Sequence, residues 1–139
     1  MYKKILVAVD GSDNSKRAAQ HAAYLASLTT EVFVEVLYIL DYDRTCSDVI
    51  QNAGREDLHI DRKNRIAPIE ALFEEHTIAY ELIIKHGEPG PTIVSHANQG
   101  DFNLVVIGSR GLNTFQEMVL GSVSHKVAKR VTAPVLIVK

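Results

Sequence analysis

A regular alternation of short apolar segments with segments of helical spacing is the feature that most constrains the fold. The first apolar segment covers residues 3–9 and ends at Asp10, a pattern typical of a buried strand that runs into a turn. From Asp13 or Ser15 to Leu28, alanine and leucine then recur at helical spacing. The alternation continues to the end of the chain, with further strands predicted over 32–40, 78–84, 103–107 and 135–138.

Helices are predicted between these strands. Apolar spacing indicates one over 66–73, one that follows the turn at 87–91 and runs to about Asn98, and a last one over 124–130. Residues 41–64 are polar and show no clean periodicity, so we interpret them as a variable connection. Glu35 interrupts the second apolar segment, and we expect it near an end or an edge.

Strands that alternate with helices predict an α/β fold, with a parallel sheet covered by helices on both faces. In such sheets, ligands bind beyond the carboxyl ends of the strands, where the strand order reverses. Two strand ends carry suitable residues: Asp10-Gly11-Ser12 follows the first strand, and a glycine-bearing stretch begins at Gly108 after the fourth. If the first and fourth strands are neighbours, these two segments form one site.

Length and composition limit the classes of protein to consider. The 139 residues match one compact domain, so we expect a single domain over 1–139. No apolar run approaches the roughly 20 residues of a membrane span, and the run at 5–9 is too short for a signal peptide. We therefore expect a cytoplasmic protein without a membrane partner. A net charge of -2 gives no basic excess, which argues against a nucleic-acid partner.

The stretch from Gly108 to Ser124 carries the chemistry. Its glycines stand at a strand exit and at a helix entrance, where a backbone without Cβ atoms lets amide groups point at phosphate oxygens. Gly121 and Ser122 open the last helix, whose unpaired amides and dipole favour an anion. No Gly-Lys-Ser/Thr follows the glycines, so the stretch is not a Walker A motif. These residues predict a phosphate-binding loop of another kind.

The residues of this stretch resemble the universal stress protein family, in particular its ATP-binding branch. That branch carries the pattern Gly-x2-Gly-x9-Gly-Ser/Thr, matched here by Gly108, Gly111, Gly121 and Ser122. The resemblance extends over nearly the whole chain, through the segments at 4–12, 87–89 and 133–138. It implies a Rossmann-like, adenine nucleotide alpha hydrolase-like fold with five parallel strands in the order 3-2-1-4-5. That order places the first and fourth strands side by side.

The resemblance also implies how ATP would be bound at its base and ribose. Ala8, Val9 and Ile39 would line the adenine pocket, and Gly108 would meet the ribose. Asp10 would face the ribose or a divalent metal, Mg²⁺ or Mn²⁺. A turn residue is the plain alternative for Asp10, because Asp-Gly-Ser is a good turn former.

By the same resemblance, the phosphates would be held by Gly111, Gly121, Ser122 and Val123. The hydroxyl of Ser124 lies within plausible reach of them, although a helix residue without ligand contact is the alternative. The family also dimerises by pairing its last strand with the two-fold mate, which implies a homodimer through residues 135–138. That pairing would remove an exposed edge from the sheet.

Several functions remain open at this point. The leading hypothesis is a regulatory protein whose ATP occupancy changes its choice of an unknown protein partner. Phosphoryl transfer needs a positioned base, and no residue of the sequence can be assigned that role, so we expect a binding protein rather than an enzyme. The alternatives are a slow ATPase with a metal on Asp10, a flavodoxin-like flavin-binding domain, and a dimeric interaction module that binds no nucleotide.

Overall fold

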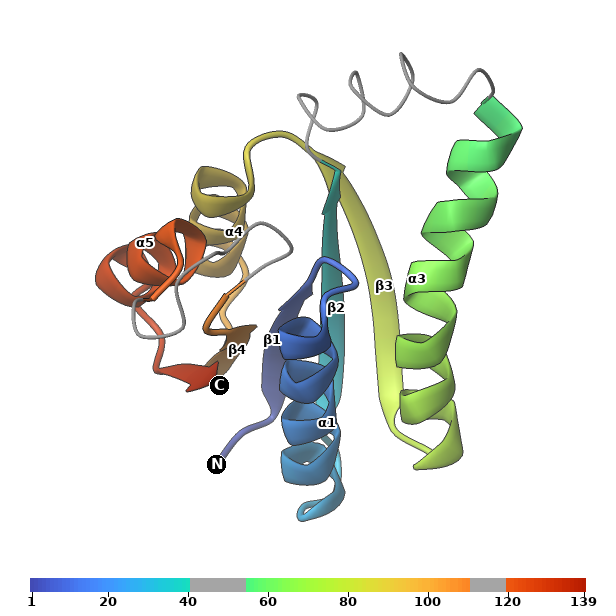
Figure 1. Cartoon of the computed structure of the whole chain (residues 1–139). Helices are drawn as coiled ribbons and strands as arrows, with labels where there is room; N and C mark the ends of the chain where they lie inside the picture. The colour runs from blue at the N-terminus through green and yellow to red at the C-terminus, as the bar shows by residue number, and fades with distance from the viewer. Residues whose placement is uncertain (41–54, 111–119) are drawn as a thin grey trace.

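Five parallel strands form the centre of the fold. The computed structural model describes residues 1–40, 55–110 and 120–139, with the backbone alone for 55–62. Its elements are β1 (Lys4–Val9), α1 (Asp13–Ser27), β2 (Phe33–Leu40), α3 (Arg55–Glu75), β3 (Ala79–His86), α4 (Pro89–Gln99), β4 (Leu104–Gly108), α5 (Ser122–Arg130) and β5 (Val135–Val138). The strands lie in the order β3-β2-β1-β4-β5, and every adjacent pair is parallel (Figure 1). The predicted fold class and strand order are confirmed.

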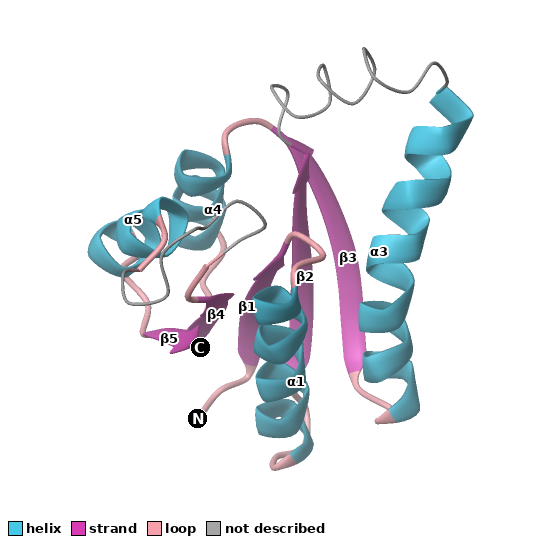
Figure 2. Cartoon of the chain, viewed as in Figure 1, coloured by secondary structure: helices cyan, strands magenta, loops and turns pink. Residues whose placement is uncertain are grey.

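Helices cover both faces of the sheet, with α1 and α3 on one face and α4 and α5 on the other (Figure 2). Each face has its own apolar core, because successive side chains of a strand point to opposite sides. Ile5, Val7 and Val9 of β1 pack on the α1 and α3 side, whereas Leu6 and Ala8 pack on the α4 and α5 side. In the described part of the chain, no helix is both long and apolar enough to cross a membrane.

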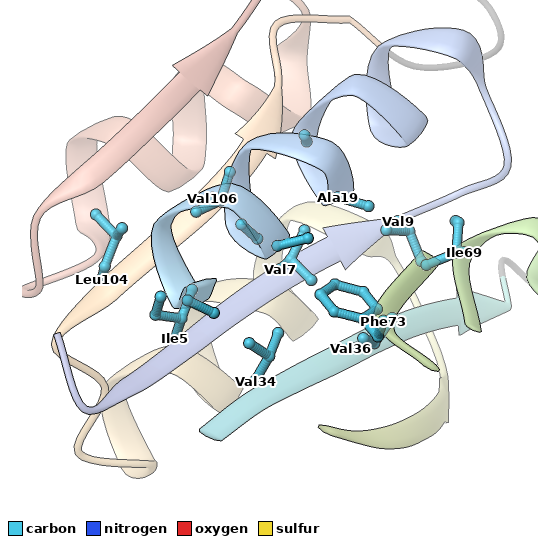
Figure 3. Packing of buried hydrophobic residues seen from close by; sticks show 14 of the residues in the cluster. Ile5, Val7, Val9, Ala19, Val34, Val36, Ile69, Phe73, Leu104 and Val106 are labelled. Atoms are coloured by element: carbon cyan, nitrogen blue, oxygen red, sulfur yellow. The ribbon is translucent and has the colours of Figure 1, made fainter. Parts of the chain in front are cut away.

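Small side chains let α1 approach the sheet closely. The residues that α1 buries in the core are all alanines, at positions 18, 19, 22, 23 and 26. Figure 3 shows Ala19 beside Val9 of β1. Because alanine keeps the helix axis near the strands, the N-terminus of α1 lies close to the carboxyl ends of β1 and β4.

The start of α3 was predicted wrongly. Helical spacing indicated a helix over 66–73 after a connection at 41–64, but α3 begins at Arg55. Among the side chains of α3 that the structure describes, those of Ile66, Ile69 and Phe73 form its buried face. Residues 55–64 therefore extend the helix without the apolar repeat that the prediction required, and charged residues such as arginine, glutamate and lysine are good helix formers. The part of the connection at 41–54 lies outside the described residues.

Glu35 does not lie at an edge of the sheet, contrary to that part of its prediction. It is the third residue of β2, an interior strand, and it is 6% exposed. The Nε2–H group of His96 on α4 donates to Glu35 Oε1, and Lys4 Nζ lies 3.8 Å from Glu35 Oε2. Lys4 Nζ also donates to the carbonyl of Gly100 at 3.0 Å and lies 4.5 Å from the centre of the Phe102 ring. The ammonium group of Lys4 and the hydrogen bond from His96 thus make the buried carboxylate tolerable.

We expect Glu35→Gln to lower the free energy of unfolding by about 1 kcal/mol. Glutamine keeps the size of the side chain but replaces two charge-assisted contacts with neutral ones. Urea denaturation of both proteins at neutral pH measures the change. The exposed glutamate at 81, which pairs in register with Glu35 on β3, supplies the control: Glu81→Gln should change stability by less than about 0.5 kcal/mol. Equal effects at the two positions would contradict a special role for the contacts of Glu35.

Candidate functional site

The sheet brings the two predicted site segments together. β1 pairs with β4 in a register that matches Ile5 with Leu104 and Val7 with Val106. The carboxyl ends of the two strands therefore lie side by side at the point where the strand order reverses (Figure 1). Asp10 follows one of these ends and Ser109 the other. The prediction that the first and fourth strands are neighbours is confirmed.

The turn after β1 is shaped by its own side chains. Asp10 Oδ1 accepts a hydrogen bond from the amide of Ser12 at 2.9 Å, and Gly11 adopts a φ of 83°, a conformation that favours glycine. Ser12 then caps α1, with its Oγ accepting from the amide of Ser15 at 3.2 Å. Asp10 thus makes the turn contact that its plain alternative requires. Its second carboxylate oxygen has no partner among the described residues.

Gly108 is where α1 comes closest to β4. A Cβ atom at Gly108 would lie 2.9 Å from the Cβ of Asn14 and 3.0 and 3.1 Å from its backbone carbon and oxygen. The missing side chain of Gly108 therefore faces helix α1. The need for a glycine here comes from packing, whether or not a ligand also approaches.

The residue after Gly108 ties three elements together. The Ser109 amide donates to the carbonyl of Val138 at 2.7 Å, at the end of β5. The Ser109 carbonyl accepts from the Gly121 amide at 2.9 Å and from the Ser124 hydroxyl at 2.8 Å. Ser109 and Ser124 are both buried. These bonds hold the N-terminus of α5 against the carboxyl end of β4.

The N-terminus of α5 keeps its backbone donors available. Its N-cap residue, Gly121, provides no side-chain cap, and the amides of Ser122, Val123 and Ser124 bond to no described group. By contrast, Ser12 caps α1. At α4, Pro89 and Pro91 lack amide hydrogens in the first turn. The amides of Asp13 and Asn14 at α1 also have no partner among the described residues, so α5 stands out by its three consecutive unpaired amides and its lack of a side-chain cap.

The predicted adenine pocket is divided by the sheet. The side chains of Ala8 and Ile39 lie on the α4 and α5 face, Ala8 within the core and Ile39 partly buried against it. The side chain of Val9 lies on the opposite face, where it packs with Ile69 and Phe73 (Figure 3). Ala8 and Ile39 can therefore share one wall, whereas Val9 could meet a ligand there only through its backbone.

The remaining predicted site residues differ in whether their side chains are exposed at the start of α5 or buried beneath it. Gly111 lies outside the described residues. The side chain of Ser122 is exposed, whereas that of Val123 packs against the core beneath α5. The hydroxyl of Ser124 faces inward, with the Ser109 carbonyl and the Gly121 carbonyl, 2.9 Å away, as its partners. At α5, the polar groups without a partner among the described residues are thus the Ser122 hydroxyl and the amides of the first turn.

Two residues at the site were missed from the sequence. Ser109 was not singled out from its motif, because its role lies in backbone contacts with distant residues. Arg65 of α3 packs over the β1–α1 turn: its Cβ and Cδ would each lie 3.1 Å from a Cβ added at Gly11. Arg65 lies at the edge of the segment interpreted as a connection, so no sequence signal placed it near Gly11.

Metal binding by protein groups alone finds no support in the described ranges. Among the described side chains, which lie in 1–40, 63–110 and 120–139, no group of three or more His, Cys, Asp or Glu residues could hold an ion. Asp10 contributes one carboxylate with one oxygen already engaged. A single carboxylate is compatible with Mg²⁺ that also binds waters and substrate phosphates.

The fold and site define a doubly wound α/β protein with an uncapped helix N-terminus at its switch point. The sequence profile of the Universal stress protein family matches residues 1–139, and the chain belongs to that family. Universal stress protein YxiE of Bacillus subtilis is 34% identical over 157 aligned positions, and the match covers 100% of both chains.

Solved structures agree with this assignment. Protein MJ0577 of Methanocaldococcus jannaschii superposes with a TM-score of 0.83 at 30% identity, and the match covers 100% of this chain and 96% of that one. A universal stress protein from Archaeoglobus fulgidus, solved in complex with dAMP, has a TM-score of 0.72 at 28% identity. That match covers 99% of this chain and 98% of its relative. At least one relative of this fold thus binds an adenine nucleotide.

Proposed function

We propose that the protein is a nucleotide-dependent regulatory protein that binds ATP at the carboxyl ends of β1 and β4. The observation that carries the proposal is the uncapped N-terminus of α5, whose first-turn amides face the switch point of the sheet. The relative from Archaeoglobus fulgidus supports an adenine nucleotide as the ligand.

In this proposal each part of the nucleotide meets a different part of the site. The phosphates bind the amides at the start of α5 and the hydroxyl of Ser122. Gly111, by the motif, extends the same cradle. The base lies against Ala8 and Ile39, and the ribose lies near Asp10 and Gly108.

A divalent cation completes the proposed site. Asp10 would hold Mg²⁺ or Mn²⁺ through its second carboxylate oxygen, and the nucleotide phosphates would supply further ligands. The cation would neutralise phosphate charge in a site where the described residues place no lysine. Regulation rather than catalysis is proposed, because no described residue is placed as a base beside the phosphates.

Regulation requires a surface that responds to the nucleotide. We propose a cytoplasmic, single-domain homodimer that pairs through β5. The outer edge of β5 has no neighbouring strand in the described sheet, and its residues are apolar. Dimer formation would cover that edge.

Replacement of Gly121 and Ser122 by valine should abolish nucleotide binding. Two β-branched side chains would crowd the first turn of α5, where a Cβ added at Gly121 would lie 3.3 Å from the Ser109 oxygen. We expect the affinity for ATP with Mg²⁺ to fall at least about 100-fold, the equivalent of about 2.7 kcal/mol. Calorimetry on protein freed of bound nucleotide measures the change, and mass spectrometry identifies any nucleotide that copurifies.

The control variant is Ala128→Val, at an exposed position near the other end of α5. It adds a β-branched residue to the same helix without touching the first turn, so its affinity should equal that of the wild type. A wild-type protein that copurifies with no nucleotide and binds none in calorimetry would refute the proposed function. The dimeric interaction module would then be the better account.

A further inference from the structure

Ser124 is a buried polar residue that the proposed binding site does not use through its side chain. It is 3% exposed, and its hydroxyl is engaged by backbone carbonyl groups of the protein. The hydroxyl has a single proton, shared between the carbonyls of Ser109 at 2.8 Å and Gly121 at 2.9 Å. This arrangement fits a residue that shapes the site rather than one that contacts the nucleotide.

The contacts of Ser124 lead to the end of the sheet. Its hydroxyl and the Gly121 amide converge on the Ser109 carbonyl, and the Ser109 amide donates to Val138 at 2.7 Å. Val138 is the last residue of β5 and is buried. Beyond it, the carbonyl of Lys139 accepts from Arg17 Nε of α1 at 3.0 Å. The carboxyl end of β5 is therefore built into the same hydrogen-bonded unit as the start of α5.

We propose that Ser124 is a positioning residue that couples the nucleotide-binding end of α5 to the carboxyl end of β5 through Ser109. The inference rests on the proposed function, since it takes the nucleotide to bind the first-turn amides of α5. A ligand held by those amides restrains the turn, and the shared carbonyl of Ser109 transmits the restraint to the bond with Val138. By linkage, order at the end of β5 favours nucleotide binding to the same extent.

Amide hydrogen exchange tests the coupling directly. In the wild type, saturating ATP with Mg²⁺ should slow exchange of the Ser109 amide about 5-fold or more. In Ser124→Ala, ATP should bind more weakly, and at saturation the slowing should fall below about twofold. Exchange followed by NMR on the labelled protein resolves this amide from those of β5.

A second measurement needs no nucleotide. Without ligand, Ser124→Ala should speed exchange of the Gly121 amide, because the start of α5 loses one of the bonds that hold it against β4 and opens more readily. A direct contact of Ser124 with phosphate would leave that exchange rate unchanged. Ser124→Thr keeps the hydroxyl and should restore both behaviours.

Ser122→Ala is the matched control, because it removes an exposed hydroxyl from the same turn. It should weaken ATP binding and leave the response of Ser109 at saturation intact. A full response in Ser124→Ala, or none in a wild type that binds ATP, overturns the coupling and leaves the proposed function standing. A wild type that binds no ATP overturns the proposed function, and exchange at Gly121 still decides whether Ser124 positions the turn.

Discussion

Replacement of Phe73 by alanine will lower the free energy of unfolding by about 3–5 kcal/mol. Phe73 is fully buried in α3 and belongs to the core that covers β1 and β2. Figure 3 shows its ring beside Val36 of β2. Alanine would leave a cavity that helix and sheet can close only in part, so both the lost burial and the cavity contribute. Denaturation in urea measures the difference.

The neighbour of Phe73 provides a second readout. The ring of Tyr80 on β3 stacks on Phe73 with 5.5 Å between centroids. Burial, the hydrogen bond from its hydroxyl to Glu74 Oε1, and the charges of Glu70 and Glu74 raise the pKa of Tyr80 to about 12. The neutral phenol is thus favoured in the folded state, and its contribution to stability is lost as pH rises from about 10 to 12. Phe73→Ala should expose Tyr80 and lower its pKa, which ultraviolet titration detects.

Phe73→Leu serves as the conservative control and should lose less than about 1.5 kcal/mol if the core repacks. A loss below 1 kcal/mol for Phe73→Ala would show that α3 is not anchored by this ring. The outcome also concerns the site, because α3 carries Arg65, whose side chain packs over Gly11 in the turn after β1. Variants that loosen α3 should therefore disturb that turn as well.

Most of the sheet could be predicted from the sequence because β1, β2, β4 and β5 are nearly continuous apolar runs. β5 was predicted at its observed bounds, and β4 within one residue. Such runs indicate strands buried on both faces, and parallel pairing follows from the helices between them. The start of α3 at Arg55 could not be predicted in this way, since no apolar repeat marks it.

The environments of buried polar residues were harder to predict from the sequence. The environment of Glu35 depends on His96 and Lys4, which lie 61 and 31 positions away in sequence, so local pattern gives no hint of it. At the site, spacing indicated which residues meet, but it did not show where their side chains point. The alternation along β1 could have separated Val9 from Ala8, because neighbours on a strand face opposite sides. The inward direction of Ser124 required the folded chain.

Substitutions at Gly108 can distinguish a requirement for glycine in helix packing from a requirement for glycine in ligand binding. The resemblance assigned Gly108 to the ribose, whereas the structure gives it a packing role against Asn14. A Cβ here would meet the backbone of α1 at 3.0 and 3.1 Å, and a helix backbone cannot move aside as a flexible side chain can. We therefore expect Gly108→Ala to lose about 1–2 kcal/mol of stability in nucleotide-free protein, and Gly108→Val about 3 kcal/mol.

The matched control is Gly121→Ala, the other glycine of the motif in the described chain. Its added Cβ would lie no closer than 3.3 Å to Ser109, so it should lose less than about 1 kcal/mol while weakening nucleotide binding. Thermal unfolding without and with ATP distinguishes the two effects, since ligand adds stability only in proportion to its binding. If Gly108→Ala were as stable as the wild type without ATP, the close approach of α1 would not be what requires glycine. We expect a loss of stability for Gly108→Ala and a loss of nucleotide affinity, with little loss of stability, for Gly121→Ala. The first glycine of the motif would then be required for the packing of α1, and the third for ligand binding.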